Sequence, residues 1–136
     1  MAFYPYLFFG GNCRDAFTRY QQIFGGELRL LTAAEMPPEE RPESGAEDLI
    51  MHAALIADGQ LLMGSDDPDG AGGPVSGMQL NFSTPDVAEA QRVFDELVEG
   101  GEVIMAMSPT SWSPSFGVCT DRFGVPWMVS ADGDAS

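Results

Sequence analysis

Hydrophobic and polar residues follow the same succession of patterns in the two halves of this chain. In the first half, alternation with a period of two predicts strands, and apolar residues spaced by three and four predict one amphipathic helix. Asn12 suits the N-cap of that helix, and Gly25-Gly26 suits its end. The predicted strands are Phe3 to Phe9, Leu28 to Thr32, Leu49 to Ala57 and Leu61 to Ser65, with a hairpin turn at Asp58-Gly59.

The second half repeats this order of elements. Thr84 is placed to cap a helix, Pro85 suits the first helical turn, and Gly100-Gly101 ends the pattern. Each half therefore reads strand, helix, strand, strand, strand. The strands predicted here are Gly77 to Ser83, Glu102 to Met107, Ser115 to Thr120 and Pro126 to Ser130, with Asp121 to Gly124 as the turn between the last two.

Recurring peptides support a duplicated unit. Phe24-Gly25-Gly26-Glu27-Leu28 returns as Glu99-Gly100-Gly101-Glu102-Val103, an offset of 75 residues. The segment 58–65 matches 123–130, but at an offset of only 65 residues. The first unit therefore carries extra residues between its helix and its last strand, which we expect to form the acidic, proline-containing loop after Thr32.

These patterns predict an α+β fold over residues 1–136, built from tandem βαβββ units with eight strands and two main helices. The first unit is expected at 1–69 and the second at 75–136, with glycine-rich residues 70–74 as a linker. Neither unit is large enough to bury an open sheet face by itself. We therefore expect the two open faces to surround a shared concavity while the helices cover the outside.

Charge and composition exclude several kinds of partner. With 21 acidic against 6 basic residues the net charge is −15, which disfavours nucleic acid and anionic membrane surfaces. The sequence has neither a long apolar run nor a signal-peptide pattern, so a cytoplasmic location is expected. Cys13 and Cys119 fit buried thiols better than a disulfide framework or a metal cluster, although the helix start at Cys13 favours a thiolate.

A series of short motifs runs along nearly the whole chain. They are Pro5-Tyr6-Leu7, Gly11-Asn12-Cys13-Arg14-Asp15-Ala16, Tyr20 with Phe24-Gly25-Gly26-Glu27, Met51-His52-Ala53, Leu62-Met63 with Ser65-Asp66, Thr110-Ser111-Trp112, Phe116-Gly117 and Asp121-Arg122-Phe123-Gly124-Val125-Pro126-Trp127. The order of these motifs on tandem βαβββ units resembles that of the PhnB-like branch of the vicinal oxygen chelate superfamily. That superfamily includes glyoxalase I, extradiol dioxygenases, and fosfomycin and bleomycin resistance proteins.

The resemblance also indicates where a metal would be held. Its metal-dependent members use His, Glu or Gln on the first and last strands of each unit. Those positions fall here near Tyr4 or Tyr6, on Met63, on Gln79 and on Met128, and among them only Gln79 suits a hard or borderline ion. We therefore expect no metal and no cofactor. Such proteins are sometimes labelled quinone methyltransferases, but this sequence lacks a glycine-rich turn of the methyl-donor type.

His52 is the only histidine and the candidate catalytic residue. If its strand face lines the concavity, it can act as a general base among Tyr4, Tyr6 and Gln79; otherwise it is a packed structural histidine. The ligand-binding candidates are Tyr4, Tyr6, Met63, Gln79, Trp112 and Met128. Trp112 lies in a polar loop, where it fits a lid over the pocket or a dimer contact equally well.

Three functions remain open at this point. The first is binding of an unidentified small molecule in an aromatic and methionine-lined cavity. The second is a metal-independent or unusually metalled lyase, isomerase or transferase with His52 as general base. The third is a drug-sequestering resistance protein. The resemblance also implies a homodimer, and the sequence does not decide whether the units pair within or between chains.

Overall fold

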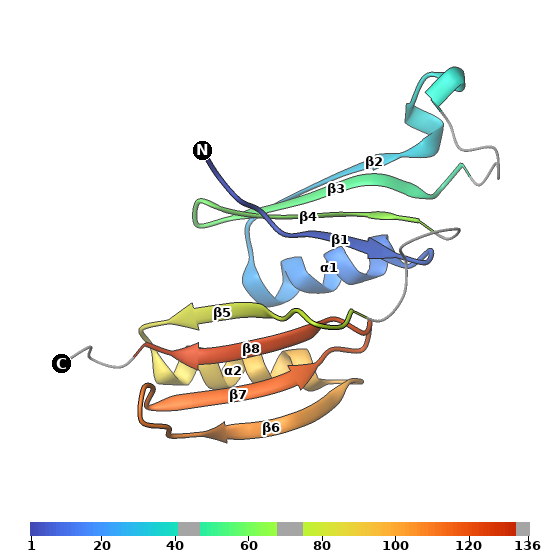
Figure 1. Ribbon diagram of the computed structural model, residues 1–136. Coiled ribbons are helices and arrows are strands. Elements are labelled where there is room, and N and C mark those ends of the chain that lie inside the picture. The colour runs from blue at the N-terminus through green and yellow to red at the C-terminus, as the bar shows by residue number, and fades with distance from the viewer. Residues whose placement is uncertain (41–46, 68–74, 133–136) are drawn as a thin grey trace. The chain divides into compact units, whose positions relative to one another are not determined.

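The computed structural model describes residues 1–40, 47–67 and 75–132, and Figure 1 shows their elements. The chain divides into two compact units, Met1–Gly73 and Pro74–Ser136. The first holds β1 (Tyr6–Phe9), α1 (Cys13–Phe24), β2 (Glu27–Thr32), β3 (Ile50–Ala57) and β4 (Gln60–Asp66). The second holds β5 (Leu80–Thr84), α2 (Val87–Val98), β6 (Glu102–Ser108), β7 (Ser115–Thr120) and β8 (Pro126–Ala131).

The two units have the same topology. Their sheets are ordered β1-β4-β3-β2 and β5-β8-β7-β6, and in each the first strand runs parallel to the last. The register repeats as well, because Tyr6 lies beside Met63 in one sheet and Asn81 beside Met128 in the other. The predicted α+β fold of two βαβββ units with eight strands and two main helices is therefore confirmed.

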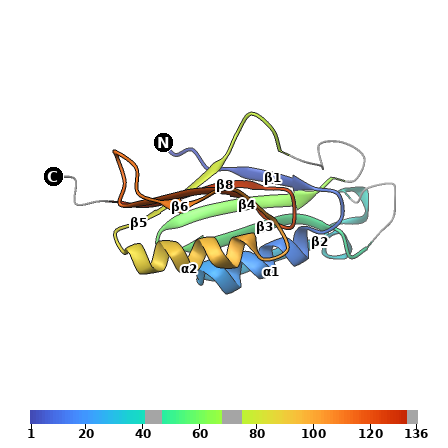
Figure 2. The same ribbon diagram turned by 90° about the horizontal axis from the view of Figure 1, so that it is seen from below.

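Within each unit the helix packs along one face of its own sheet, as Figure 2 shows. In the first unit Leu7 and Phe9 are buried on that face, and the ring of Phe17 from α1 lies so close to Gly64 that an added Cβ would approach it to 2.7 Å. Strand neighbours point to opposite faces. Met63 and Ser65, on either side of Gly64, therefore face away from the helix.

Asn12 is the N-cap residue of α1, as predicted, but another side chain makes the cap hydrogen bonds. Asn12 makes no side-chain cap hydrogen bond. Instead, Oδ1 of Asp66 accepts hydrogen bonds from the backbone N–H groups of Gly11 and Cys13 at 3.1 and 2.9 Å, and Oδ2 accepts one from Ile50 at 2.9 Å. A carboxylate from the end of β4 thus accepts hydrogen bonds from backbone N–H groups that have no partner within α1. The sequence around Asn12 does not reveal this long-range contact.

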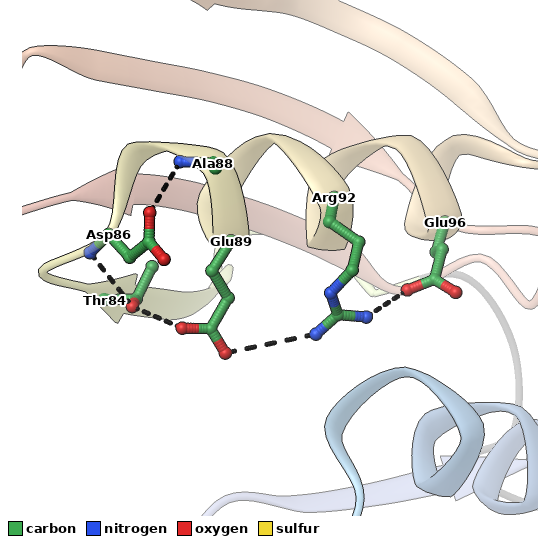
Figure 3. A network of polar contacts seen from close by, with 6 residues as sticks. All are labelled: Thr84, Asp86, Ala88, Glu89, Arg92 and Glu96. Atoms are coloured by element: carbon green, nitrogen blue, oxygen red, sulfur yellow. Dashed lines mark hydrogen bonds and ion pairs between the residues drawn. The ribbon is translucent and has the colours of Figure 1, made fainter.

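The cap of α2 is displaced from the prediction. Asp86, rather than Thr84, is the N-cap, and its Oδ1 accepts a hydrogen bond from the Ala88 N–H at 2.9 Å. The hydroxyl of Thr84 instead donates to Glu89 at 2.7 Å and accepts from the Asp86 N–H at 3.3 Å. Figure 3 shows this network continuing along α2, where Arg92 pairs with Glu89 and with Glu96.

Other differences lie at the ends of predicted elements. β1 begins at Tyr6 rather than Phe3, and β5 begins at Leu80 rather than Gly77. The acidic loop, expected to be irregular, contains two short 3-10 helices at Ala33–Glu35 and Pro38–Glu40. The rest of its proline-containing part at 41–46 and the expected linker at 70–74 lie outside the described residues. In the described part of the chain, no helix is both long and apolar enough to span a membrane.

Candidate functional site

The uncovered face of the first sheet carries large apolar side chains. Because Leu7 and Phe9 turn toward α1, the alternating residues Tyr6 and Phe8 lie on the other face, where they are 38% and 42% exposed. Leu31 on β2 lies beside His52 on β3 and is 37% exposed. An aromatic and aliphatic surface therefore covers the side of this sheet opposite the helix. We call Tyr6, Phe8, Leu31, His52 and Met63 the first-sheet surface.

A hydrogen bond joins the two polar groups of the first-sheet surface. The hydroxyl of Tyr6 lies 3.2 Å from Nδ1 of His52, and their ring centroids are 5.8 Å apart. The ring of Phe8 packs beside Tyr6 with a centroid distance of 5.3 Å. If the tyrosine donates, Nε2 of His52 carries the proton; if Nδ1–H donates, Nε2 has a free lone pair. Either tautomer leaves Nε2 outside this hydrogen bond.

Met63 completes this surface from the neighbouring strand. It pairs in register with Tyr6 on one side and with Ala54 on the other, and it is half-buried. Ala54 beside it is buried, and the thioether of Met63 can adapt its shape to a neighbouring group. Tyr4 is exposed but precedes β1, so no strand register fixes its ring. The structure thus brings together Tyr6, His52 and Met63 of the predicted set.

The other predicted ligand-binding residues belong to the second unit. Met128 lies beside Asn81 on the face of the second sheet opposite α2, since its neighbours Trp127 and Val129 are buried against the helix. Gln79 is exposed directly before β5 and continues the alternation of Asn81. Trp112 is 68% exposed and packs edge-on against Phe116, with ring centroids 5.5 Å apart.

Phe8 and Leu31 were not among the predicted site residues. The alternation in Phe3 to Phe9 already placed Phe8 on the same face as Tyr6, which was the available signal. Leu31 gave no such signal, because its position beside His52 depends on the pairing of β2 with β3.

Ser65 and Asp66, considered above only as parts of a motif, are buried. Asp66 holds backbone groups at the start of α1 and β3, so it stabilises the fold beneath the first-sheet surface. Among residues 1–40, 47–67 and 75–132, no three His, Cys, Asp or Glu side chains gather where they could hold a metal ion.

The two cysteines are buried thiols. Burial, with a smaller effect of the Asp66 charge, raises the pKa of Cys13 to about 12 despite its place at the start of α1. Burial and the nearby Asp121 carboxylate raise the pKa of Cys119 to about 11. Both groups are therefore protonated at neutral pH, and neither has the character of a reactive thiolate.

Comparison with known proteins assigns nearly the whole chain to one protein family. Residues 1–130 match the family model described as 3-demethylubiquinone-9 3-methyltransferase. The chain is 38% identical to Protein YjdN of Escherichia coli (strain K12) over 135 residues, covering 93% of this chain and 92% of YjdN. Protein PA1353 from Pseudomonas aeruginosa has a crystal structure that matches with a TM-score of 0.89 at 42% identity, covering 98% of this chain and 99% of that one.

More distant solved structures share the fold alone. A PhnB protein from Bacillus cereus, titled a putative 3-demethylubiquinone-9 3-methyltransferase, matches with a TM-score of 0.75 at 22% identity, covering 96% of this chain and 99% of that one. A fosfomycin resistance protein and a glyoxalase-related enzyme also match. The expected glyoxalase/bleomycin resistance-like fold is thereby confirmed.

Proposed function

Because the chain belongs to the PhnB-like family of the vicinal oxygen chelate superfamily, we propose that it binds a small molecule through its first-sheet surface. The observation that carries the proposal is the hydrogen-bonded pair of Tyr6 and His52, set among Phe8, Leu31 and Met63. Aromatic and aliphatic groups around a few polar atoms are typical of ligand sites, in which apolar contact supplies affinity and polar groups fix orientation.

Charge and side-chain chemistry define the class of ligand. With a net charge of −15, the protein repels anions at long range and attracts cations. Tyr6 and Phe8 offer ring faces, whereas Nε2 of His52 offers one hydrogen bond in either tautomer. We therefore propose a neutral or cationic ligand with an aromatic or otherwise planar part and a polar group that reaches His52.

Catalysis at the same place is the second candidate. When Nδ1–H of His52 donates to the Tyr6 oxygen, Nε2 is unprotonated and can accept a proton from a bound substrate. The phenol then stabilises the imidazolium that forms by accepting its Nδ1–H hydrogen bond. This is the role of general base in a metal-independent lyase, isomerase or transferase. If binding is stoichiometric and no product forms, the protein instead sequesters its ligand.

Nuclear magnetic resonance of tag-free protein tests this site directly. His52 is the only histidine, so the two carbon-bound protons of its imidazole are identified without further assignment. Titration with a panel of neutral and cationic aromatic metabolites and antibiotics is expected to shift these resonances saturably for at least one compound. A panel that leaves them unchanged contradicts binding at His52.

Variants separate this site from binding elsewhere. His52→Ala and Tyr6→Phe are expected to weaken the thermal stabilisation that a positive compound gives, while Thr18→Ala on the exposed side of α1 retains it. Equal stabilisation of all three variants would place the ligand away from the first-sheet surface. For the enzymatic candidate, turnover that survives His52→Ala removes the proposed base. A homodimer stays a prediction, which sedimentation equilibrium tests.

A further inference from the structure

The hairpin between β3 and β4 has a loop of only two residues, Asp58 and Gly59. Ala57 pairs with Gln60 across the two strands, so no other residue belongs to the loop. The φ angles of the two residues are 51° and 75°, and a type I′ turn requires positive values at both positions. Among residues 1–40, 47–67 and 75–132, Asp58 is the one residue other than glycine that has a positive φ. Its backbone is therefore held in a conformation that few residues with a side chain adopt.

Asp58 and Gly59 carry two groups that can react with each other. The γ-carboxyl carbon of an aspartate and the backbone nitrogen of the next residue close a small ring when they bond. A side chain on that next residue normally crowds the nitrogen, but Gly59 has none. In the described structure, nothing lies within 4 Å of the Cβ position that glycine leaves empty. Both residues are exposed at the tip of the hairpin, so the protein around them does not obstruct ring closure.

The backbone of the turn can reach the geometry of this ring by a local rotation. A type II′ turn has the same positive φ at its first central residue as a type I′ turn, and the two differ mainly in the orientation of the peptide group between the central residues. Glycine tolerates both signs of φ, so Gly59 can follow the rotation. A cyclic imide fixes ψ of Asp58 and leaves its φ positive, which fits the type II′ arrangement. The ring can therefore form without unpairing β3 from β4.

The turn between β7 and β8 provides a contrast within the same chain. Asp121 there is buried, and its Oδ1 accepts hydrogen bonds from the N–H groups of Phe123 and Val125 at 2.9 and 3.0 Å. Its Oδ2 accepts another from Nε1 of Trp127 at 2.9 Å. The residue that follows is Arg122, whose side chain crowds its own backbone nitrogen. Three donors thus hold the Asp121 carboxylate in place, which disfavours the same reaction at this turn.

We infer that Asp58 is a modification site, at which aspartate converts spontaneously to isoaspartate through a cyclic imide with Gly59. The Gly59 nitrogen bonds to Cγ of Asp58, and the hydroxyl of the protonated carboxyl group leaves as water together with the amide hydrogen. Water then adds to one of the two imide carbonyl groups. Breaking the bond from nitrogen to Cγ restores aspartate, whereas breaking the bond from nitrogen to the α-carbonyl carbon gives isoaspartate. The water lost in the first step is regained in the second, so no oxidant or cofactor is consumed.

Isoaspartate changes the length of the loop. The main chain then runs through Cβ and Cγ of residue 58, which adds one atom to the backbone, while the former α-carboxyl group becomes the charged branch. Loop length and turn type fix the register of a hairpin, and a two-residue loop has no slack to absorb the addition. The pairs nearest the turn, Ala57 with Gln60 and Ile56 with Leu61, are therefore expected to loosen. This change requires no ligand at the first-sheet surface.

The test ages the full folded chain in mildly acidic and neutral buffer. An isoaspartyl methyltransferase assay measures total isoaspartate, and electron-transfer fragmentation assigns it to individual residues by mass spectrometry. Isoaspartate is expected to accumulate at Asp58 but not at Asp121, and the converted form, once separated, is expected to unfold at a lower temperature. Asp69-Gly70 is another Asp-Gly pair of the sequence and serves as a positive control for the chemistry. Absence of isoaspartate at Asp58, or equal conversion at Asp58 and Asp121, overturns the proposal.

Variants decide whether the turn itself governs the reaction. Gly59→Ala is expected to convert about tenfold more slowly, because the new Cβ crowds the attacking nitrogen. Gln60→Ala, an exposed position directly after the loop, is the matched control and is expected to convert at the wild-type rate. If Gly59→Ala disrupts the hairpin, Asp58→Asn provides a second test, since asparagine tolerates the same φ and loses ammonia through the same imide. Equal rates in Gly59→Ala and the wild-type protein, or an Asp58→Asn variant that releases no ammonia, overturn the proposal.

Discussion

The hydroxyl of Tyr6 on β1 reaches Nδ1 of His52 on β3 at 3.2 Å, across the intervening strand β4. The two residues are 46 positions apart, and the parallel pairing of β1 with β4 brings them onto one face. This contact gives the only histidine of the chain a fixed neighbour on the face of the sheet opposite α1. The ring of Tyr6 thus lies between those of His52 and Phe8 in a chain of ring contacts, with centroid distances of 5.8 and 5.3 Å.

Tyr6→Phe is expected to change the tautomer ratio of His52, because the variant removes the hydrogen-bond partner of Nδ1. The loss of one hydrogen bond of about 1 kcal/mol corresponds to roughly a fivefold change in such a ratio. Nitrogen-15 correlation spectra of the imidazole measure it. Tyr4→Phe removes a hydroxyl from a nearby exposed tyrosine and is expected to leave the ratio unchanged. Unchanged Nδ1 and Nε2 resonances in Tyr6→Phe would contradict the hydrogen bond.

Asp66→Ala is expected to destabilise the protein by about 3–5 kcal/mol, because it leaves three backbone N–H groups without their charged acceptor. Urea unfolding followed by circular dichroism measures the loss. Asp15→Ala, an exposed acidic residue in the first turn of α1, is the control and should cost about 1 kcal/mol or less. A loss below 1 kcal/mol for Asp66→Ala would show that water replaces the carboxylate.

Gly64→Ala is expected to destabilise the first unit by about 1–3 kcal/mol, since the new methyl group would lie 2.7 Å from the Phe17 ring and 2.8 Å from the Leu7 carbonyl oxygen. Gly10→Ala is a matched control, because nothing lies within 4 Å of the added Cβ. That variant should be neutral or slightly stabilising, since alanine restricts the unfolded chain. Thermal unfolding of the two variants compares them, and equal midpoints would refute the close packing of Gly64.

Alkaline pH is expected to destabilise the fold through Cys13 and Cys119. Their pKa values are raised from 9.0 in an ordinary thiol to about 12 and about 11, so the folded state binds the protons more tightly than the unfolded state. Stability contributed by these thiols is therefore fully present below pH 9 and is lost as pH rises to about 11 for Cys119 and to about 12 for Cys13. Between pH 9 and 10 the loss is about 1 kcal/mol for each thiol.

Replacing both cysteines isolates this pH effect. Unfolding of the wild-type protein and of a Cys13→Ala, Cys119→Ala variant at several pH values shows whether the steeper decline belongs to the thiols. The variant is expected to be less stable at neutral pH because buried sulfur contacts are lost, but its stability should fall less between pH 9 and 10. Parallel pH profiles would contradict the raised pKa values.

Zinc and manganese are expected to leave the unfolding temperature unchanged. The superfamily resemblance places metal ligands near Tyr4 or Tyr6, on Met63, on Gln79 and on Met128. The structure sets Tyr6 beside Met63, whereas Asn81 rather than Gln79 lies beside Met128. A thioether is a poor ligand for either ion, and no carboxylate or imidazole occupies these four positions. Differential scanning fluorimetry with each ion, against an EDTA control, measures the effect. A rise that saturates at micromolar ion would disprove this prediction.

The sequence by itself determined the duplicated unit and the alternation within it. The hydrophobic periods of two residues in strands and near 3.6 residues in helices follow from local backbone geometry. They can therefore be recognised without knowing which strands pair. The hairpin turn at Asp58-Gly59 is also a local feature that the sequence reveals. Both residues adopt the positive φ angles, 51° and 75°, that such turns require. The shared face of Tyr6 and Phe8 was predictable for this reason as well.

Only the tertiary structure decided which distant residues meet. Asn12 holds the N-cap position of α1, but Asp66 accepts the hydrogen bonds there, because its buried carboxylate on β4 reaches backbone donors of both α1 and β3. Leu31 beside His52 and Phe116 beside Ser130 likewise depend on strand register. Contacts between strands are set by pairing across tens of residues, and a one-residue slip would turn each side chain to the other face.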